Sequence, residues 1–265
     1  MEWHVKEGES ITSDQFPRHC ATVRGPIRKI LLGERVALNI LARCSGIASK
    51  SASLVAALRA NGWAGTLAGT RKTTPGFRLV EKYGILVGGA DPHRHDLSSM
   101  TMLKDNHIWA CANNNKNSST SGSSSSSAAA ASELAPPEQQ ARYGGGQDFI
   151  AAAIPLAVHA AKAAAGFSNK VEVECTSIAE ADSAIQAGAD VIMLDNFTAD
   201  GVRSAAQHLK RTWARTNKSF LIEVSGGLTE SNAASYVCND VDILSTSSIH
   251  QGAGIVDFSL KVSLR

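Results

Sequence analysis

With 265 residues and a net charge of +2, the chain is long enough for one large α/β domain. Its charge gives no global reason to expect nucleic acid or an anionic membrane as partner. No apolar run reaches the roughly 20 residues that span a bilayer. The scattered cysteines have no zinc-ligand spacing and favour a reducing compartment, with the cytoplasm as the first choice and the nucleus also open: Cys20, Cys44, Cys111, Cys175 and Cys238.

The first 31 residues differ from the rest of the chain. Val5, Ile11 and the stretch Ala21 to Val23 are apolar and separated by polar turns, so we expect short strands of a small sheet there. We therefore predict a remnant of a small sheet-containing domain over residues 1–31 and one α/β domain over residues 32–265.

From residue 32 onward, helical patterns alternate with short apolar segments. Near-continuous apolar strands between helices are typical of a parallel sheet that helices cover. A barrel with its site at the carboxyl ends of the strands is favoured over a doubly wound sheet, since no GxGxxG follows the first strand. The predicted helices are 32–45, 50–61, 74–83, 149–166, 178–188, 199–213 and 230–237, and the predicted strands are 66–70, 85–88, 170–175, 191–195, 220–224 and 243–246.

Residues 113–147 break this pattern. Ser, Asn, Ala, Pro and Gly dominate the segment, which cannot bury enough apolar area to offset the entropy of ordering it. We interpret it as a low-complexity insertion into one domain, and a linker between two domains as the alternative.

Basic residues follow two of the predicted strands. Arg71 and Lys72 come directly after strand 66–70, and the run His93-Arg94-His95 follows strand 85–88, with Lys104 ten residues on. Guanidinium and ammonium groups that converge are costly without a neutralising anion, so the pattern predicts a site for a polyanion. A solvated charged loop is the alternative.

Carboxylates stand at the ends of two later strands. Glu174 closes the run VEVEC and Asp195 closes VIMLD, so both would lie at the rim of a barrel and could hold Mg²⁺ or ribose hydroxyls. Glu172 alternates with Glu174 and is a further candidate. Each carboxylate alone could instead be a helix cap or a surface charge.

Glycine and serine turns follow the last two predicted strands. Ser225, Gly226 and Gly227 precede a helix that begins near Thr229, and Ser247-Ser248 follow strand 243–246. Backbone N–H groups at such a turn and helix start favour a phosphate. The two turns together predict a phosphate site.

At this point the residues resemble a known family. The segments GTRKTTPGFRLVEKYGILVGGADPHRHDL, MLKDNHI, VEVEC, IMLDNF and EVSGGLT are similar to quinolinate phosphoribosyltransferases, and STSSIHQG at 245–252 is similar to fungal members. The resemblance implies an open, seven-stranded, TIM-like α/β barrel beside an N-terminal α/β sandwich domain, which we expect to be shortened here. We expect the tail from about residue 250 to pack back on the sandwich part.

The resemblance also implies the activity and the residue roles. The family transfers phosphoribosyl from phosphoribosyl pyrophosphate to quinolinate and releases CO₂ and pyrophosphate, giving nicotinate mononucleotide for NAD biosynthesis. It implies dimers or dimer-based hexamers in which Arg35 reaches the neighbouring subunit. Arg71, His93, Arg94 and Lys104 would meet the quinolinate carboxylates, Lys72 the pyrophosphate, Glu174 and Asp195 the ribose and Mg²⁺, and Ser225, Gly226, Gly227, Ser247 and Ser248 the 5′-phosphate. Lys72, Lys104, Glu174 and Asp195 are the expected catalytic residues.

Two alternatives stay open. A related enzyme on the same barrel would act on nicotinate, although the density of cationic groups between Arg71 and Lys104 favours a dicarboxylate. A shortened chain could also be a non-catalytic family member. An assay for quinolinate-dependent nicotinate mononucleotide separates these possibilities.

Overall fold

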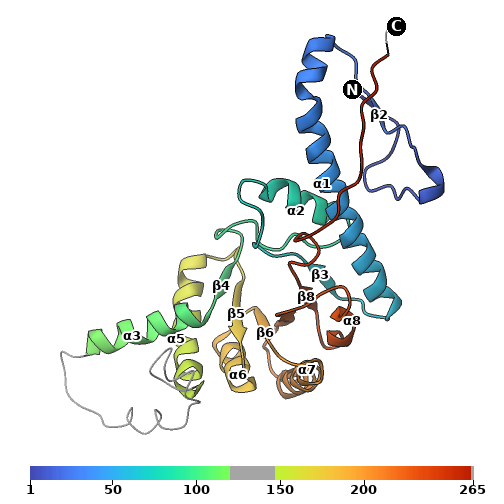
Figure 1. Ribbon diagram of the computed structural model, residues 1–265. Helices are drawn as coiled ribbons and strands as arrows, with labels where there is room; N and C mark the ends of the chain where they lie inside the picture. The colour runs from blue at the N-terminus through green and yellow to red at the C-terminus, as the bar shows by residue number, and fades with distance from the viewer. Residues whose placement is uncertain (120–146, 264–265) are drawn as a thin grey trace. The chain divides into compact units, whose positions relative to one another are not determined.

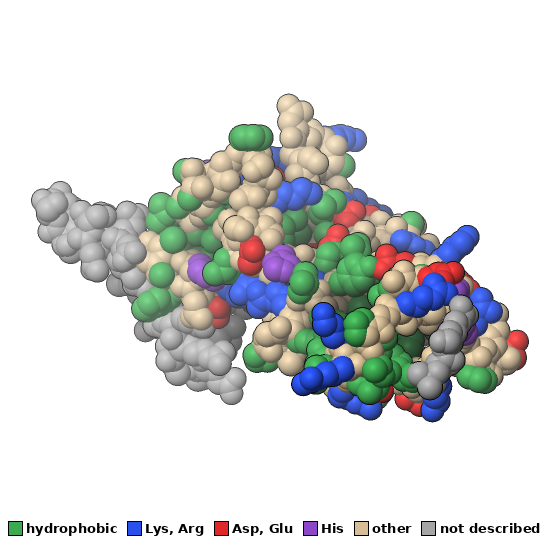
Figure 2. All heavy atoms as spheres, turned by 90° about the horizontal axis from the view of Figure 1, so that it is seen from above, with side chains coloured by type: hydrophobic (Ala, Val, Ile, Leu, Met, Phe, Trp, Pro, Cys, Tyr) green, Lys and Arg blue, Asp and Glu red, His purple; other side chains and the backbone are tan. Residues whose placement is uncertain are grey.

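The computed structural model describes residues 1–119 and 147–263, which form two compact units. Unit 1 comprises Met1–His95, Leu228–Ala234 and Thr246–Arg265, and unit 2 comprises Asp96–Gly227 and Ser235–Ser245. Most of the predicted insertion, residues 120–146, lies outside the described residues. Figure 2 shows basic side chains interspersed with acidic and hydrophobic ones on the face that it presents.

Parallel strands form the centre of unit 2. They are neighbours in chain order and run in one direction, with Val173 opposite Ile192 and Ile192 opposite Ile222. All three of these side chains have no exposed surface. A parallel sheet that is buried on both faces selects such apolar runs, so the prediction of an α/β fold with a parallel sheet is confirmed. The strands are β4 (Thr101–Leu103), β5 (Val171–Cys175), β6 (Val191–Asp195), β7 (Leu221–Ser225) and β8 (Ile243–Ser245).

The helices of unit 2 lie beside these strands (Figure 1). The hydroxyl groups of Ser177 and Thr198 cap the amino ends of α6 and α7, because they accept hydrogen bonds from the backbone nitrogens of Glu180 and Gly201. Each cap fixes where a helix begins just after a strand ends. The helices are α3 (Asp105–Ser119), α5 (Gln147–Ala165), α6 (Ile178–Ala187) and α7 (Ala199–Trp213), with the short α8 (Ala233–Tyr236) further along the chain.

Two aspartates tie the opposite, amino ends of these strands. The Oδ2 atom of Asp190 accepts from the backbone nitrogen of Val171 at 2.8 Å and from Nζ of Lys162 at 2.8 Å. Asp242 repeats the arrangement and accepts from the backbone of Ile222 at 2.7 Å and from Lys210 at 2.8 Å. These bonds join strand and helix far from the strands' carboxyl ends, so they serve stability.

Unit 1 is built around the long helix α1 (Ile27–Ala60), with α2 (Arg78–Val87) packed against it. The C-terminal segment runs along α1 (Figure 1), and the backbone nitrogen of Val256 donates to the carbonyl of Ala42. A Cβ atom at Gly46 would overlap the carbonyl oxygen of Gly254, so glycine permits this close approach. Unit 1 also holds β3 (Thr66–Ala68) and an antiparallel pair, β1 (Glu2–Trp3) and β2 (Ala21–Thr22), with the 3-10 turn η1 (Ser13–Gln15) between them.

Some predicted elements are wrong. The expected strand 85–88 is the end of α2, because a short apolar run does not distinguish a strand from a buried helix face, and Ile85 is fully buried on that helix. The helices predicted at 32–45 and 50–61 are one helix, since the glycine between them is needed for packing and does not interrupt α1. Val5 and Ile11 lie outside the strands.

Two predicted boundaries fall inside helices. α3 continues through Ser119, so its last turns cover the expected start of the insertion at residue 113. The predicted domain boundary after residue 31 lies within α1, and it stays a prediction together with the closure and strand number of the barrel. No helix among the described residues has both the length and the apolar character that crossing a membrane requires.

Candidate active site

Unit 2 places four of the predicted site residues at the carboxyl ends of four neighbouring strands. Lys104 directly follows β4, Glu174 is the penultimate residue of β5, and Asp195 and Ser225 end β6 and β7. Asp195 lies opposite Ser225 in the strand register. The carboxyl ends of parallel strands share one edge of a sheet, and the sequence motifs therefore meet there.

Lys104 and Glu174 form an ion pair at this edge. The Glu174 side chain is only 17% exposed, whereas that of Lys104 is 45% exposed, so the ammonium group reaches solvent while the carboxylate is mostly enclosed. The exposed ammonium can contact a ligand anion while it stays paired with Glu174, so the enclosed carboxylate keeps its partner. The sequence predicted both residues as catalytic, and the structure brings them together.

Asn196 connects the ends of β6 and β7. Its backbone nitrogen donates to the carbonyl of Ser225 at 3.2 Å, and its Nδ2 atom donates to Oδ2 of Asp195 at 2.6 Å. Asn196 has a φ of 60°, a conformation that Asn adopts more readily than most residues. Asn196 was not among the residues predicted from the sequence, although an Asn directly after a strand-terminal Asp is a signal that could have indicated it.

The turn after β7 requires its glycines. Gly226 and Gly227 have φ values of 103° and 61°, which disfavour any residue with a side chain. Successive residues in this conformation leave a turn whose backbone can approach an anion closely. The role of this turn in binding a phosphate stays a prediction.

Two further carboxylates lie deeper in unit 2. Glu172 of β5 and Glu223 of β7 are 0% and 1% exposed, and their carboxylate oxygens come within 4.8 Å of one another. Glu172 precedes Glu174 by two positions and Glu223 precedes Ser225 by two, so each shares a face of the sheet with that residue. Glu172, the further candidate from the sequence, thus belongs to the layer below Glu174.

In unit 1, basic side chains gather around the buried Lys82 of α2. Lys82 is 4% exposed and donates to the carbonyl of Pro92. Burial and the positive charges of Arg78, Arg94 and Arg71 lower the pKa of Lys82 to about 8, against the attraction of Asp91. Arg71 and Arg94 belong to two separate segments of the sequence, and both lower the pKa of the same side chain, that of Lys82.

Arg78 joins these two segments and was missed by the sequence analysis. Its Nε atom donates to the hydroxyl of Thr73 at 3.2 Å and its Nη1 atom to the carbonyl of His95 at 3.1 Å. His93 has a φ of 57°, and its backbone nitrogen donates to Oδ1 of Asp91 at 2.6 Å. Left-handed backbone at a histidine is uncommon and marks a locally constrained segment.

Ser247 and Ser248 lie in unit 1 with the chain that follows the glycine turn. The hydroxyl of Thr246 donates to the carbonyl of Leu228 at 2.6 Å and accepts from the backbone nitrogen of Ser248 at 3.0 Å. These bonds hold the Ser247-Ser248 turn beside the segment that starts at Leu228. The structure thus orders the Ser247-Ser248 turn, the part of the predicted phosphate site that lies in unit 1.

Comparison with known proteins decides the family. The profile "Quinolinate phosphoribosyl transferase, C-terminal domain" matches residues 47–131 and 148–261, and the profile of the N-terminal domain of the same family matches residues 1–45. The chain belongs to the quinolinate phosphoribosyl transferase family. It is thus a family member in which residues 132–147, inside the predicted insertion, match neither profile.

Curated relatives and solved structures of the quinolinate phosphoribosyl transferase family cover nearly the whole chain. The chain is 42% identical to the human "Nicotinate-nucleotide pyrophosphorylase [carboxylating]" over 99% of its own length and 72% of that protein, and 38% identical to the Dictyostelium discoideum protein of that name over 98% and 76%. The crystal structure of NadC from Streptococcus pyogenes is similar with a TM-score of 0.68 and 32% identity, covering 98% of this chain and 73% of that one.

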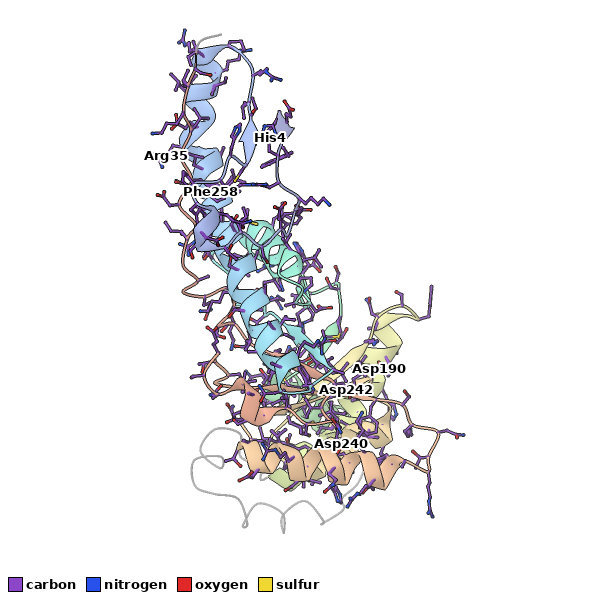
Figure 3. All side chains as sticks on the ribbon, turned by 90° about the vertical axis from the view of Figure 1, so that its right-hand side faces the viewer. His4, Arg35, Asp190, Asp240, Asp242 and Phe258 are labelled. Atoms are coloured by element: carbon purple, nitrogen blue, oxygen red, sulfur yellow. The ribbon has the colours of Figure 1, made fainter. Side chains whose placement is uncertain are left out.

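Arg35 lies on the exposed surface of α1 in this phosphoribosyl transferase. Figure 3 shows it on the stretch of α1 that the C-terminal segment follows, near Phe258. An exposed arginine on a long helix is accessible to another molecule. The role of Arg35 at a neighbouring subunit stays a prediction.

Cys175 is not suited to act as a nucleophile. The residue is fully buried in β5, and burial, followed by the charges of Glu180, Glu174 and Glu172, raises the pKa of its thiol well above the usual value. A protonated, enclosed thiol is inert.

Proposed function

We propose that this chain transfers the phosphoribosyl group of phosphoribosyl pyrophosphate to the ring nitrogen of quinolinate, with loss of CO₂ and pyrophosphate, to give nicotinate mononucleotide. The observation that carries the proposal is the convergence of Arg71, Arg78 and Arg94 on the buried Lys82 in a chain of this family. So many cationic groups in one place are stable when a ligand of several negative charges neutralises them.

Quinolinate carries two carboxylates, and the basic groups of unit 1 suit that substrate better than the monoacid nicotinate. We assign Arg71, His93 and Arg94 to the two carboxylates, with Lys104 of unit 2 in the role that the family implies. Arginine binds a carboxylate through two parallel N–H donors, which fixes the plane of the ring that bears it. Bound in this way, quinolinate would present its pyridine nitrogen for attack.

Glu174 and Asp195 are proposed to serve the ribose, with Lys104 held beside Glu174. As the bond to pyrophosphate breaks, positive charge develops on the sugar, and fixed carboxylates stabilise that charge. Lys72 is proposed to receive the negative charge of the leaving pyrophosphate. No covalent intermediate with the protein is needed for this displacement.

Mg²⁺ is the proposed metal ion. Glu174 and Asp195 offer carboxylate oxygens from neighbouring strand ends, and oxygen ligands of this kind suit Mg²⁺ together with substrate phosphates and ribose. When bound, the ion would neutralise charge on the pyrophosphate.

Ser225, Gly226, Gly227, Ser247 and Ser248 are proposed to hold the 5′-phosphate. The left-handed glycines support this role, because backbone N–H groups at such a turn can point toward one anion. After transfer, the pyridine nitrogen is cationic and stabilises the electron pair that stays on the adjacent ring carbon when its carboxylate leaves as CO₂, and this carbon then takes a proton from solvent. The basic groups must therefore bind that carboxylate no more tightly in the ground state than in the transition state in which it leaves.

The deciding experiment is an assay for nicotinate mononucleotide with quinolinate, phosphoribosyl pyrophosphate and Mg²⁺. Turnover of quinolinate well above turnover of nicotinate is expected. Preference for nicotinate would favour the related enzyme, and a folded chain without either activity would favour a non-catalytic member. Assembly into dimers or dimer-based hexamers, the sharing of Arg35 and a cytoplasmic location are further proposals. The free cysteines of the described residues support the location.

A further inference from the structure

A buried acid–histidine pair in unit 1 has no part in the chemistry proposed above. The side chains of His250 and Glu81 are 0% and 4% exposed, and the Nδ1 atom of His250 lies 3.1 Å from Oε2 of Glu81. Glu81 belongs to α2 and His250 to the C-terminal segment, 169 residues apart in the sequence. Burying two such groups is costly unless all their polar atoms are used.

Their remaining polar atoms contact the loop 70–74, which carries Arg71 and Lys72. The Nε2 atom of His250 lies 3.3 Å from the hydroxyl of Thr70, and that hydroxyl accepts from the backbone nitrogen of Lys72 at 3.1 Å. On the other side, Oε1 of Glu81 accepts from the backbone nitrogen of Thr74 at 3.2 Å. A single hydrogen-bonded chain thus starts at Lys72 and returns to the loop at Thr74.

The chemistry of the groups sets the direction of each bond in this chain. A carboxylate only accepts, so Nδ1 of His250 carries the proton toward Glu81. Burial lowers the pKa of His250, and the positive charge of Lys82 lowers it further. The Glu81 carboxylate opposes this shift. In the neutral ring Nε2 is an acceptor, so the Thr70 hydroxyl donates to it and keeps its lone pairs for the Lys72 N–H.

Gln251, next in the chain, adds a second connection. Its Nε2 atom donates to the backbone carbonyl of Lys72 at 2.8 Å. The backbone of Lys72 is therefore bound at both its N–H and its carbonyl group, and that of Thr74 at its N–H. All these bonds use backbone atoms of the loop, so they fix where the Lys72 side chain starts.

We propose that Glu81 and His250 are positioning residues that hold the loop 70–74 in the conformation in which Lys72 binds pyrophosphate. This inference rests on the proposed role of Lys72, and it explains which hydrogen bonds hold the loop that carries Lys72. Groups that bind a leaving anion must be held to within fractions of an ångström to be effective.

Hydrogen exchange on the unliganded chain tests the connection itself. Thr70→Val removes the hydroxyl while keeping a similar volume, and His250→Asn keeps an amide facing Glu81 but loses the atom facing Thr70. Both variants are expected to speed exchange of the Lys72 amide about tenfold: Thr70→Val removes the acceptor of its N–H, and His250→Asn removes the atom that orients this acceptor. His208→Asn, on the half-exposed surface of α7, is the matched control and should leave that amide unchanged.

Calorimetric titration with inorganic pyrophosphate and Mg²⁺ tests the consequence. Thr70→Val and His250→Asn should each weaken binding about tenfold, and the double variant no further, since both break the same link. His250→Gln, whose amide can reach Thr70, should recover most of the affinity. A residue with only a structural role would shift the melting temperature without this pattern.

The outcomes separate this inference from the proposed function. Faster exchange with unchanged pyrophosphate affinity, or fully additive losses in the double variant, would overturn the positioning role. If His250→Asn does not fold, Thr70→Val alone decides the question by the same two readouts. A wild-type chain that binds pyrophosphate but makes no nicotinate mononucleotide would overturn the function and leave the positioning role standing.

Discussion

Gly226 packs against Asn196 so closely that a Cβ atom at position 226 would stand 2.5 Å from the Oδ1 atom of Asn196 and 2.9 Å from its backbone nitrogen. Both residues have left-handed backbone, with φ values of 103° and 60°. The ends of β6 and β7 therefore meet in a contact that admits only glycine at 226. This contact holds the glycine turn next to Asn196, the residue that follows Asp195.

Gly226→Ala should destabilise the chain by about 2 to 4 kcal/mol, the sum of left-handed backbone strain and steric overlap with Asn196. Gly188→Ala is the matched control, since Gly188 has a φ of 91° but nothing within 4 Å of its Cβ position. It should cost only about 1 to 2 kcal/mol. Denaturant unfolding measures both, and equal losses would show that the Asn196 contact has no energetic effect.

Glu174→Gln and Lys104→Met should each reduce formation of nicotinate mononucleotide by roughly 100-fold or more while changing stability by about 1 kcal/mol. The pair is partly exposed, so solvent screens its contribution to folding, whereas charge near the reacting sugar acts in the transition state. Lys162→Met is the control, because Lys162 pairs with Asp190 at the opposite ends of the strands. It should alter stability similarly and leave turnover intact. Measured kcat and unfolding curves decide, and parallel losses in all three variants would contradict the prediction.

Four parallel strands of unit 2, β5 to β8, were the most predictable part of the fold, whereas β4 was not predicted. VIMLD is mostly apolar, VEVEC alternates β-branched valine with glutamate, and the observed bounds of both lie within one residue of the predicted ones. The segment around Ile85 was not predictable in the same way, because its apolar face packs on α1, a partner that the local sequence does not reveal. Tertiary packing decided between helix and strand there.

The site was predictable where a charged residue ends a strand. Glu174 and Asp195 needed only the strand positions and the rule that parallel strands share a carboxyl edge, whereas Lys104 was predicted from its nearness to the basic run His93-Arg94-His95, since β4 before it was not predicted. Asn196, Arg78 and Lys82 were missed, since each acts through a contact made by a turn or a helix face. His250 illustrates the limit, because its partners are about 170 and 180 residues away in the chain.

Binding of quinolinate should be accompanied by proton uptake near pH 8. The pKa of Lys82 is lowered to about 8 by burial and then by Arg78, Arg94 and Arg71. An anion that neutralises these arginines removes part of the lowering, so the pKa rises and a deprotonated fraction of Lys82 takes up a proton. Titration calorimetry at pH 8 in buffers of different ionisation enthalpy measures the uptake.

Lys82→Met should abolish this uptake at pH 8, and wild-type uptake should fade below pH 7, where Lys82 is already protonated. Uptake that persists in the variant would assign the proton to another group. No uptake in the wild type would mean that the anion does not bind near the three arginines.

Arg35 should complement an active-site variant in trans if it serves a neighbouring subunit. Arg35→Ala and Glu174→Gln chains should each be nearly inactive alone. In a dimer of one chain of each kind, the site with the intact Glu174 would receive the intact Arg35 from its partner. Random mixing makes half of the dimers mixed, each with one working site of two, so activity should return to about a quarter of the wild-type value.

A pair of variants within one unit provides the control for this mixing. Lys104 and Glu174 lie together in unit 2 of the same chain, so Lys104→Met mixed with Glu174→Gln would give every site one defect and no recovery. Co-expression with two affinity tags, followed by the nicotinate mononucleotide assay, makes the comparison. If only the mixture of Arg35→Ala and Glu174→Gln chains recovers activity, the working site must receive its arginine from another subunit, because neither chain carries both intact residues. If neither mixture recovers while mixed dimers are isolated, Arg35 acts within its own chain or outside the site.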